Sequence, residues 1–250
     1  MVDTVTENIL YVENLHAWFG STQVLFGVNF SVRAGEIMVI LGTSGCGKTT
    51  LLKNIIRLYS PGRGSVLLLG QEMTMLEEEE IETVLRNVGV MYQHGALLNS
   101  LTVGENVALP LEMHTSMSPE LRREVAALKL RQVELVGVYD RYPRELSGGM
   151  QKRAAVARAM VMDPDIIFCD EPSAGLDPVT AQDLDRLLVS LNETLGMTIV
   201  VVTHELESIK HIAHRITYLD KGKAIFSGTI DEALKSDLTQ IHKFFLKTEK

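Results

Sequence analysis

Residues 42–49 read Gly-Thr-Ser-Gly-Cys-Gly-Lys-Thr and directly follow the apolar run of residues 37–41. They match the pattern G-x-x-x-x-G-K-[ST] at every fixed position, and a chance match in a chain of this length is on the order of 1 in 100. Glycines at this spacing let backbone N–H groups turn inward around an anion, and the next helix adds its positive end. The stretch therefore predicts a phosphate-binding loop between a buried strand and a helix; a glycine-rich turn that binds nothing is the weaker alternative.

Two side chains of this loop suit a nucleotide. We expect Lys48 to reach the β- and γ-phosphates and the Thr49 hydroxyl to bind Mg²⁺. An apolar helix is expected after the loop, because residues 51–56 carry apolar side chains at helical spacing. We interpret Cys46, inside the loop, as a small residue that fills a tight turn and not as a redox group.

The composition is that of a folded protein, since 46% of the 250 residues are hydrophobic and 22% are charged. With 24 Lys+Arg against 32 Asp+Glu, the formal net charge is −8, which argues against a nucleic-acid partner. An acidic chain can still bind a polyphosphate when backbone amides are the donors. Two cysteines, Cys46 and Cys169, exclude a disulfide framework and a cysteine zinc site and indicate a reducing compartment.

The sequence carries no recognisable membrane or export signal. Its unbroken apolar runs are as long as one buried strand and far short of the roughly 20 residues of a membrane span. The N-terminal residues lack the basic and apolar regions of a signal peptide. We therefore expect a cytoplasmic protein.

Two kinds of strand are predicted. Residues 28–33 alternate apolar and polar side chains, and with an earlier strand over 9–15 they indicate an antiparallel sheet with one wet face. Unbroken apolar runs follow at residues 37–41, 88–92, 166–169 and 199–202. Such runs indicate mostly parallel strands covered by helices, so the expected fold class is α/β.

Helical periodicity lies between these strands. One helix is marked by Leu184, Leu187, Leu188 and Leu191. Another is expected to begin with Ser118 as N-cap and Pro119 in its first turn. Its apolar face is predicted to contain Leu121, Val125 and Leu128.

Three local signals mark element ends. Thr74 and Glu77 have the spacing of a capping box, and Asp231 is expected to cap a C-terminal helix. Residues 221–223 predict a tight turn between two late strands.

We predict one domain over residues 1–250, made of four parts. The parts are an antiparallel β subdomain at 1–34, a RecA-like core at 35–99 and 159–228, a helical subdomain at 100–158 and a C-terminal helical tail at 229–250.

Residues 165–171, Asp-Ile-Ile-Phe-Cys-Asp-Glu, place two carboxylates at the end of a buried strand. A carboxylate there is costly unless it meets a cation, so Asp170 is expected to hold Mg²⁺ directly or through water. Glu171 points differently and is a candidate to accept a proton from an attacking water. Its alternative role is to cap the loop before Pro172.

Residues 146–151, Leu-Ser-Gly-Gly-Met-Gln, open another helix. Ser147 followed by Gly148 and Gly149 gives a second helix start suited to an anion, although an ordinary N-cap uses the same residue types. The functional interpretation is favoured because the phosphate loop and the carboxylate pair occur in the same chain.

Together these segments resemble the ATP-binding subunits of ABC transporters over residues 9–228. Residues 42–49 are similar to the Walker A motif, 166–170 to the Walker B strand, 146–151 to the signature and 173–177 to the D-loop. Met150 stands where many members of the family have glutamine.

The resemblance implies a role for single residues. Glu171 would be the catalytic glutamate, Gln93 the Q-loop glutamine that contacts Mg²⁺ and water, and His204 the switch histidine at the γ-phosphate. Alone, His204 would be interpreted as a satisfied histidine at a strand end. Phe19 occupies the place of the aromatic residue that stacks on adenine. The residues implied to bind ATP are Phe19, Gly42, Thr43, Ser44, Gly45, Cys46, Gly47, Lys48, Thr49, Thr50, Ser147, Gly148 and Gly149, and those implied to bind Mg²⁺ are Thr49, Gln93 and Asp170.

In this family each ATP lies between the Walker A loop of one subunit and the signature of another. The resemblance therefore implies a head-to-tail dimer of two copies, in which residues 147–149 act in trans. Such a dimer would drive an integral membrane permease from the cytoplasmic face of the inner membrane, bound peripherally through that permease. Residues 94–111 are expected to form the docking surface.

Residues 93–98 (Gln-His-Gly-Ala-Leu-Leu) and 106–111 (Asn-Val-Ala-Leu-Pro-Leu) look like the lipid-transporting Mla/Mce-type, MlaF-like ATPases. That likeness implies phospholipid or another hydrophobic lipid as the cargo, moved between membranes. The implied partners are an MlaE-like permease, a STAS-domain subunit and an Mce-domain protein.

Three alternatives stay open. The ATPase of an amino-acid or lipoprotein ABC system would have the same chemistry and another cargo. A non-transport ABC protein is expected to fuse two ATPase units or insert a long coiled coil, and neither occurs in this sequence. A P-loop GTPase or kinase would leave the signature unexplained, and the sequence has no Asn-Lys-x-Asp guanine motif.

Overall fold

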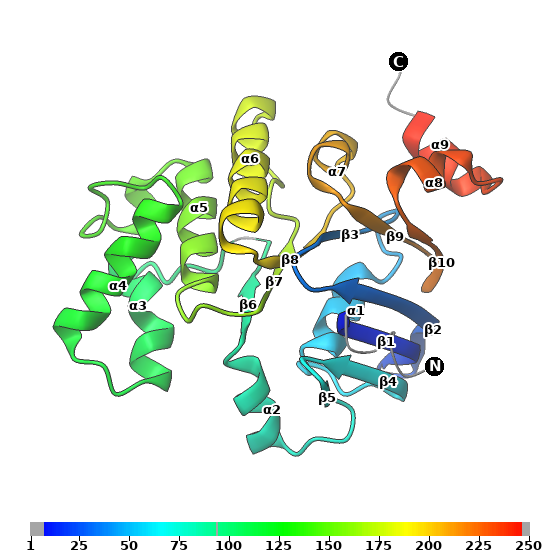
Figure 1. Cartoon of the computed structure of the whole chain (residues 1–250), viewed down its shortest axis with the longest axis horizontal. Helices are drawn as coiled ribbons and strands as arrows, with labels where there is room; N and C mark the ends of the chain where they lie inside the picture. Colours follow the sequence, from blue (N-terminus) through cyan, green and yellow to red (C-terminus); the bar gives the residue numbers. More distant parts are fainter. Residues whose placement is uncertain (1–7, 94, 247–250) are drawn as a thin grey trace. The chain divides into compact units, whose positions relative to one another are not determined.

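The computed structural model describes residues 8–93 and 95–246. The chain forms two compact units (Figure 1). The first unit joins the chain up to Val84 to the chain from Thr198 onward, and the second runs from Leu85 to Met197. His94, the first residue of the expected docking surface, lies outside the described residues.

An antiparallel sheet forms the N-terminal part of the first unit. Its strands are β1 (Asn8–Phe19), β2 (Thr22–Arg33), β4 (Arg63–Leu68) and β5 (Gln71–Glu72), in the order β2-β1-β4-β5. The predicted strands at 9–15 and 28–33 are both present but too short. Register shifts such as that between Val12 and Leu15 interrupt the alternation, which hides the rest of the ladder from a period-2 pattern.

A second group of strands in the first unit leads to the phosphate loop. It contains β3 (Ile37–Leu41), β8 (Thr198–Val202), β9 (Arg215–Asp220) and β10 (Lys223–Gly228). β3 pairs in parallel with β8 on one side and β9 on the other, and every residue of β3 and β8 is buried. β10 returns antiparallel to β9 through the predicted turn, where Lys221 and Gly222 both have positive φ (47° and 75°), as a tight hairpin turn requires.

The helices of the first unit are α1 (Lys48–Ile55), α2 (Glu78–Leu85), α7 (Leu206–Ile212), α8 (Ile230–Lys235) and α9 (Thr239–Leu246). Two of them, α2 and α8, are not capped by the residues that were predicted to cap them. The predicted capping box of Thr74 and Glu77 is wrong, because Thr74 bonds to the Glu72 carboxylate, and the Glu77 N–H donates to Glu80.

The predicted cap at Asp231 is also wrong. Thr229 caps α8, because its hydroxyl accepts the N–H of Glu232 and the Glu232 carboxylate accepts the N–H of Thr229. This reciprocal pair satisfies two N–H groups at the helix start, whereas Asp231 lies one residue inside the helix.

The second unit combines two parallel strands with helices. The strands are β6 (Val88–Met91) and β7 (Ile166–Asp170), and the helices are α3 (Val103–His114), α4 (Pro119–Gln132), α5 (Gly148–Ala159) and α6 (Pro178–Leu195), with a 3-10 turn at Pro143–Glu145. The helices α3, α4 and α5 lie side by side (Figure 1). The α/β class, with mostly parallel strands and a separate antiparallel N-terminal sheet, is confirmed.

The buried face of α4 was predicted wrongly. Ser118 and Pro119 begin the helix as expected, but Leu121 and Leu128 are 45% and 46% exposed. The buried residues are Ala126, Leu130 and Lys129, whose ammonium pairs with Asp163. A pattern of leucines cannot reveal that Lys129 lies on the buried face, because the burial of this cation depends on a carboxylate far away in the sequence.

No helix among the described residues 8–93 and 95–246 is both long and apolar enough to cross a membrane.

Helix α6 offers a direct test of packing. Its predicted leucines are buried, and Leu188 is only 1% exposed, whereas Leu195 at the end of the same helix is 46% exposed. We expect Leu188→Ala to lower the free energy of unfolding by about 2–5 kcal/mol, because it leaves a cavity. The matched variant Leu195→Ala should change it by no more than about 0.5 kcal/mol. Urea unfolding followed by far-UV circular dichroism measures both, and equal losses would contradict the assigned face.

Candidate nucleotide-binding site

The loop after β3 is shaped by its main chain. Gly42 has φ 153°, and a Cβ atom placed there would lie 2.1 Å from the carbonyl oxygen of Leu219 in β9. Gly47, with φ 107°, precedes α1, which has no side-chain cap and no acidic residue in its first turn. The N–H groups of this helix start are therefore not matched to a side chain of the loop, as an anion site requires.

Lys48 is buried, whereas several other residues of the loop are exposed. Its side chain is 7% exposed, and Nζ donates to the carbonyl oxygens of Gly42 (2.9 Å) and Thr43 (3.4 Å). Thr43, Ser44, Gly45 and Thr49 are exposed around it. A cation beside exposed main chain and hydroxyl groups fits a polyphosphate, since phosphate oxygens offer this ammonium stronger acceptors than the carbonyls.

The hairpin of β9 and β10 supports the loop from behind. The N–H of Gly222 donates to the carbonyl of Cys46 (3.0 Å), and the carbonyl of Gly222 accepts from Phe26 in β2 (2.8 Å). Burial raises the pKa of the Cys46 thiol, and it raises the pKa of Cys169 in β7 to about 12. Neither cysteine is thus set up as a thiolate, which supports the interpretation of Cys46 as a turn filler.

A pocket of about 450 Å³ opens beside the loop in the first unit. Its lining residues are Thr43, His204, Leu206, Tyr218, Asp220, Gln240, Lys243 and Phe244. His204 follows β8 and is exposed, so the structure brings two predicted site residues, Thr43 and His204, to one pocket. Sequence reasoning missed the contribution of α9; the i, i+3, i+4 spacing of its three lining residues was the available signal.

Phe19 lies at the end of β1 and is 67% exposed. Its ring packs against Tyr59, with centroids 6.4 Å apart and planes inclined by 56°. The Lys53 ammonium lies 5.2 Å from the centroid of the Tyr59 ring. Phe19 therefore presents an aromatic surface, backed by residues of α1 and the loop after it. No sequence signal pointed to Tyr59.

The two predicted carboxylates lie at the end of β7 in the second unit. Asp170 is the last residue of the strand and is 5% exposed; Glu171 follows and is 9% exposed. Glu171 has φ 46°, in the left-handed region that a side chain with a Cβ atom disfavours. Such strained residues cluster at functional sites, so the geometry favours a chemical role for Glu171.

Gln93 follows β6 and is exposed, and the loop that continues from it is held by hydrogen bonds from α5. Arg158 of α5 donates to the carbonyl oxygens of Gly95 and Ala96, both at 2.7 Å. Lys152 of the same helix donates to the carbonyls of Gln93 and Glu171. Sequence reasoning missed Lys152 and Arg158, because a basic residue on a helix gives no signal that it will bind the carbonyl groups of distant loops.

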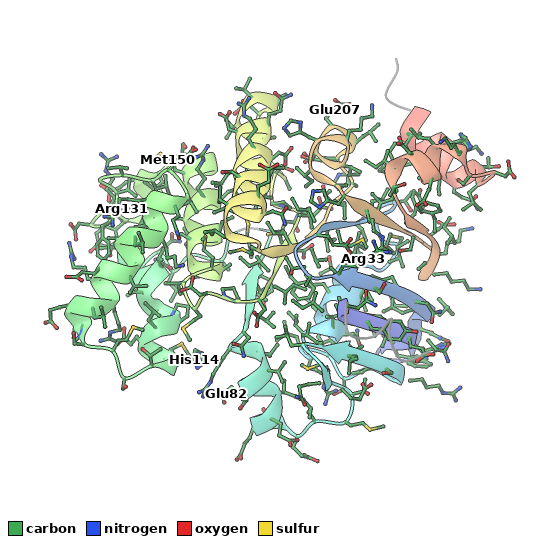
Figure 2. The ribbon with its side chains drawn as sticks, viewed as in Figure 1. Arg33, Glu82, His114, Arg131, Met150 and Glu207 are labelled. Atoms are coloured by element: carbon green, nitrogen blue, oxygen red, sulfur yellow. The ribbon has the colours of Figure 1, made fainter. Side chains whose placement is uncertain are left out.

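The predicted start of α5 is present. Ser147 is its N-cap, and its hydroxyl accepts the N–H of Met150 (3.3 Å), a residue in the first turn that is labelled in Figure 2. Ser147 and Gly148 are exposed, whereas a Cβ atom at Gly149 would lie 2.4 Å from Cγ2 of Thr180. Two of the three residues are therefore open to a ligand, and the third needs glycine for close packing.

The segment predicted as the D-loop ends in a helix cap. The Asp177 carboxylate accepts the N–H groups of Val179 and Thr180, both at 3.1 Å, and begins α6. The hydrogen bonds of Thr180, its hydroxyl first, lower the pKa of Asp177. Asp177 thus has a structural role that its place in the motif did not indicate.

The donor set for a metal fits Mg²⁺ better than a transition metal. In the described part of the chain, no group of three or more histidine, cysteine or acidic residues could hold a metal ion. The predicted ligands Thr49, Gln93 and Asp170 offer only oxygen atoms among their metal-binding groups, and Mg²⁺ keeps waters and substrate phosphates in its shell. A metal that arrives with a nucleotide needs no preformed protein cage.

Known families match this chain over most of its length. A family model described as ABC transporter matches residues 25–174. The methionine import ATP-binding protein MetN of Haemophilus influenzae is 38% identical over 227 residues, which cover 90% of this chain and 65% of that protein. The MetN protein of Escherichia coli O157:H7 is 38% identical over 233 residues, or 93% of this chain and 68% of the relative. The chain thus spans about two thirds of the length of these relatives.

Solved structures agree with the fold. A dimeric ATP-binding cassette in a post-hydrolysis state, bound to ADP and phosphate, is 34% identical with a TM-score of 0.80, over 88% of this chain and 98% of that one. The cbiO1 protein of Clostridium perfringens, part of the ABC transporter complex cbiONQ, is 27% identical with a TM-score of 0.84, over 92% of each chain.

The loop geometry predicts the effect of removing its cation. We expect Lys48→Ala to weaken ATP binding by about 10- to 100-fold, since a charge-assisted hydrogen bond is lost. Isothermal titration with ATP measures the change. The control is Lys210→Ala, which removes a half-exposed lysine of the same unit and should leave the affinity as it is. Unchanged ATP affinity in Lys48→Ala would refute the role of this side chain.

Proposed function

The chain belongs to the ABC transporter family and carries its ATP-hydrolysing domain, and from this premise we propose that it powers a membrane transporter. ATP is the nucleotide of this family and Mg²⁺ its usual partner ion. The observation that carries the proposal is the loop around Lys48, in which a buried ammonium lies beside exposed main chain at a helix start. The coupling to transport, the cargo and the partners belong to the proposal, because the chain spans only 65% of the first relative.

We assign ATP binding to the phosphate loop and the exposed aromatic ring. Residues 42–50 would surround the phosphates, and Phe19 would stack on the adenine ring. Thr49, Gln93 and Asp170 would hold Mg²⁺, which neutralises phosphate charge when it is bound. The exposure of Phe19 and Thr49 supports these roles.

We assign hydrolysis to Glu171, with Gln93 and His204 as its helpers. Glu171 would accept the proton of the attacking water, because its carboxylate is nearly buried and its main chain is held in a strained conformation. Gln93 would orient that water through its exposed side chain. His204, at the pocket beside Thr43, would contact the γ-phosphate.

Two copies would form the working unit. Ser147, Gly148 and Gly149 of one copy would bind the ATP held by the phosphate loop of the other. The exposed Ser147 and Gly148 at the start of α5 support this role, as does the dimeric state of the similar solved cassette. The dimer would act at the cytoplasmic face of the inner membrane, held there by an integral permease.

An amino acid is the best supported cargo, with methionine as the first candidate and import as the direction. The relatives at 38% identity are methionine import proteins, whereas none of them supports the expected lipid transport. This favours the alternative from the sequence analysis, the ATPase of an amino-acid ABC system, over the first interpretation, lipid transport. It also leaves the MlaE-like permease, the STAS-domain subunit and the Mce-domain protein without support from these relatives.

One observation weakens the sequence likeness to lipid ATPases. Asn106 is fully buried and its amide group bonds to the main chain of Leu98, Leu101 and Thr102. This asparagine is therefore required to fold the segment before α3, whatever the cargo is. Lipid transport stays a second candidate on the likeness in residues 93–98, of which Leu98 is 46% exposed.

The cargo can be tested on the assembled transporter. We expect the chain, copurified with its permease in lipid vesicles, to show ATP-dependent uptake of radiolabelled methionine that Glu171→Gln abolishes. Mass spectrometry of lipids retained by the same complex tests the second candidate. Lipid enrichment over bulk membrane, without methionine uptake, would reverse the order of the two candidates.

Hydrolysis makes a separate prediction. We expect Glu171→Gln to bind ATP normally and to lower turnover by about 100-fold or more, because the proton acceptor is lost. Phosphate release and ATP titration measure the two effects. Glu193→Gln, which changes an exposed glutamate of α6, is the matched control and should keep wild-type turnover. A near wild-type rate in Glu171→Gln would exclude Glu171 as the base.

A further inference from the structure

Lys152 joins two loops that carry predicted catalytic residues. It lies on α5, two residues after Met150, and is only 7% exposed. Its ammonium donates to the carbonyl oxygen of Gln93 and, at 3.4 Å, to the carbonyl oxygen of Glu171. These residues follow the parallel strands β6 and β7, so one side chain connects the carboxyl ends of both strands.

A buried lysine needs such partners. Removing an ammonium from water is costly unless its N–H groups are satisfied, and carbonyl oxygens with free lone pairs can accept them. The two acceptors belong to the main chain, so their positions do not depend on side-chain rotamers. The contact therefore fixes the backbone at Gln93 and Glu171 through their carbonyl groups.

Both loops depend on outside support. Glu171 has φ 46°, and its carbonyl is bonded by the N–H of Ala174 (3.2 Å) as well as by Lys152. In the other loop, Ala96 has φ 48°, and Arg158 holds its carbonyl from α5. Non-glycine residues persist in this conformation only where their surroundings impose it. Helix α5 supplies that constraint to both loops.

We propose that Lys152 is a positioning residue for ATP hydrolysis, which holds Gln93 and Glu171 in register from the helix that begins at Ser147. The inference rests on the proposed roles of Gln93 and Glu171. It adds that α5 links two parts of the site within the second unit. The start of this helix is assigned to ATP binding in trans, and Lys152 of the same helix holds the two residues assigned to hydrolysis.

The proposal predicts a split between binding and turnover. In the full-length chain, Lys152→Met should lower kcat by about 10- to 100-fold, because small displacements of reacting groups cost that much. The affinity for ATP should stay within about twofold, since the phosphate loop and Lys48 are untouched. Lys152→Arg, whose guanidinium can also donate to two carbonyls, should restore kcat to within about fivefold. ATP titration and steady-state phosphate release measure these values.

A matched control separates positioning from stability. Lys129 is another buried lysine of the second unit, 4% exposed and paired with Asp163. Lys129→Met also removes a buried cation, so it should lower the melting temperature while kcat stays near wild type. If Lys152→Met does not fold, Lys152→Gln takes its place, with the same expected loss of kcat at constant ATP affinity.

The outcomes are distinct. Equal losses of kcat in the variants of Lys152 and Lys129, or a weaker ATP affinity in Lys152→Met, would overturn the positioning role in favour of a structural one. Wild-type kcat in Lys152→Met beside an inactive Glu171→Gln would also overturn it, while the proposed function stands. If Glu171→Gln itself keeps its activity, the proposed role of Glu171 as the base fails first, and this inference fails with it.

Discussion

The phosphate loop depends on a close contact between two segments of the backbone, at Gly42 and at Leu219. The Leu219 carbonyl of β9 approaches Gly42 so closely that a side chain would not fit, and the next turn donates the Gly222 N–H to Cys46. The loop therefore takes its shape from a strand and a hairpin that lie far from it in the sequence. The exposed Thr43 and Thr49 and the buried ammonium of Lys48 are placed by this backbone.

In the second unit, cationic side chains hold the backbone of the functional loops. Its reactive candidates stand on loops after β6 and β7, and the loops include residues in left-handed conformations. Lys152 and Arg158 of α5 bind the carbonyl groups of these loops. In both units the main chain is held by contacts from a distant element, so the conformation of the loops is set through their backbone.

The sequence predicted most of the fold for physical reasons that act locally. Unbroken apolar runs found β3, β6, β7 and β8, although not β9, which also pairs in parallel with β3, and the glycine pattern found the loop before α1. The predictions were wrong where a distant partner decides the outcome, as at α4, where the pairing with Asp163 allows Lys129 to be buried. The same limit hid Lys152, because a helical lysine shows its acceptors only after the strands are assembled. The likeness in residues 106–111 carries little weight for another reason, since the buried Asn106 is needed to fold its own segment.

The close approach at Gly42 also has a consequence for biosynthesis. β3 pairs with β9, and the Ile37 N–H at the start of β3 donates to His214, which is 177 positions further along the chain. Contacts of such separation form slowly and only after both segments exist. On the ribosome, residues 42–49 emerge before β9 and its hairpin, and they gain their support only after both have been made. The nucleotide loop thus stays without this support until residues 215–228 have been made, so a nascent chain that stops before them lacks the supported form of the loop.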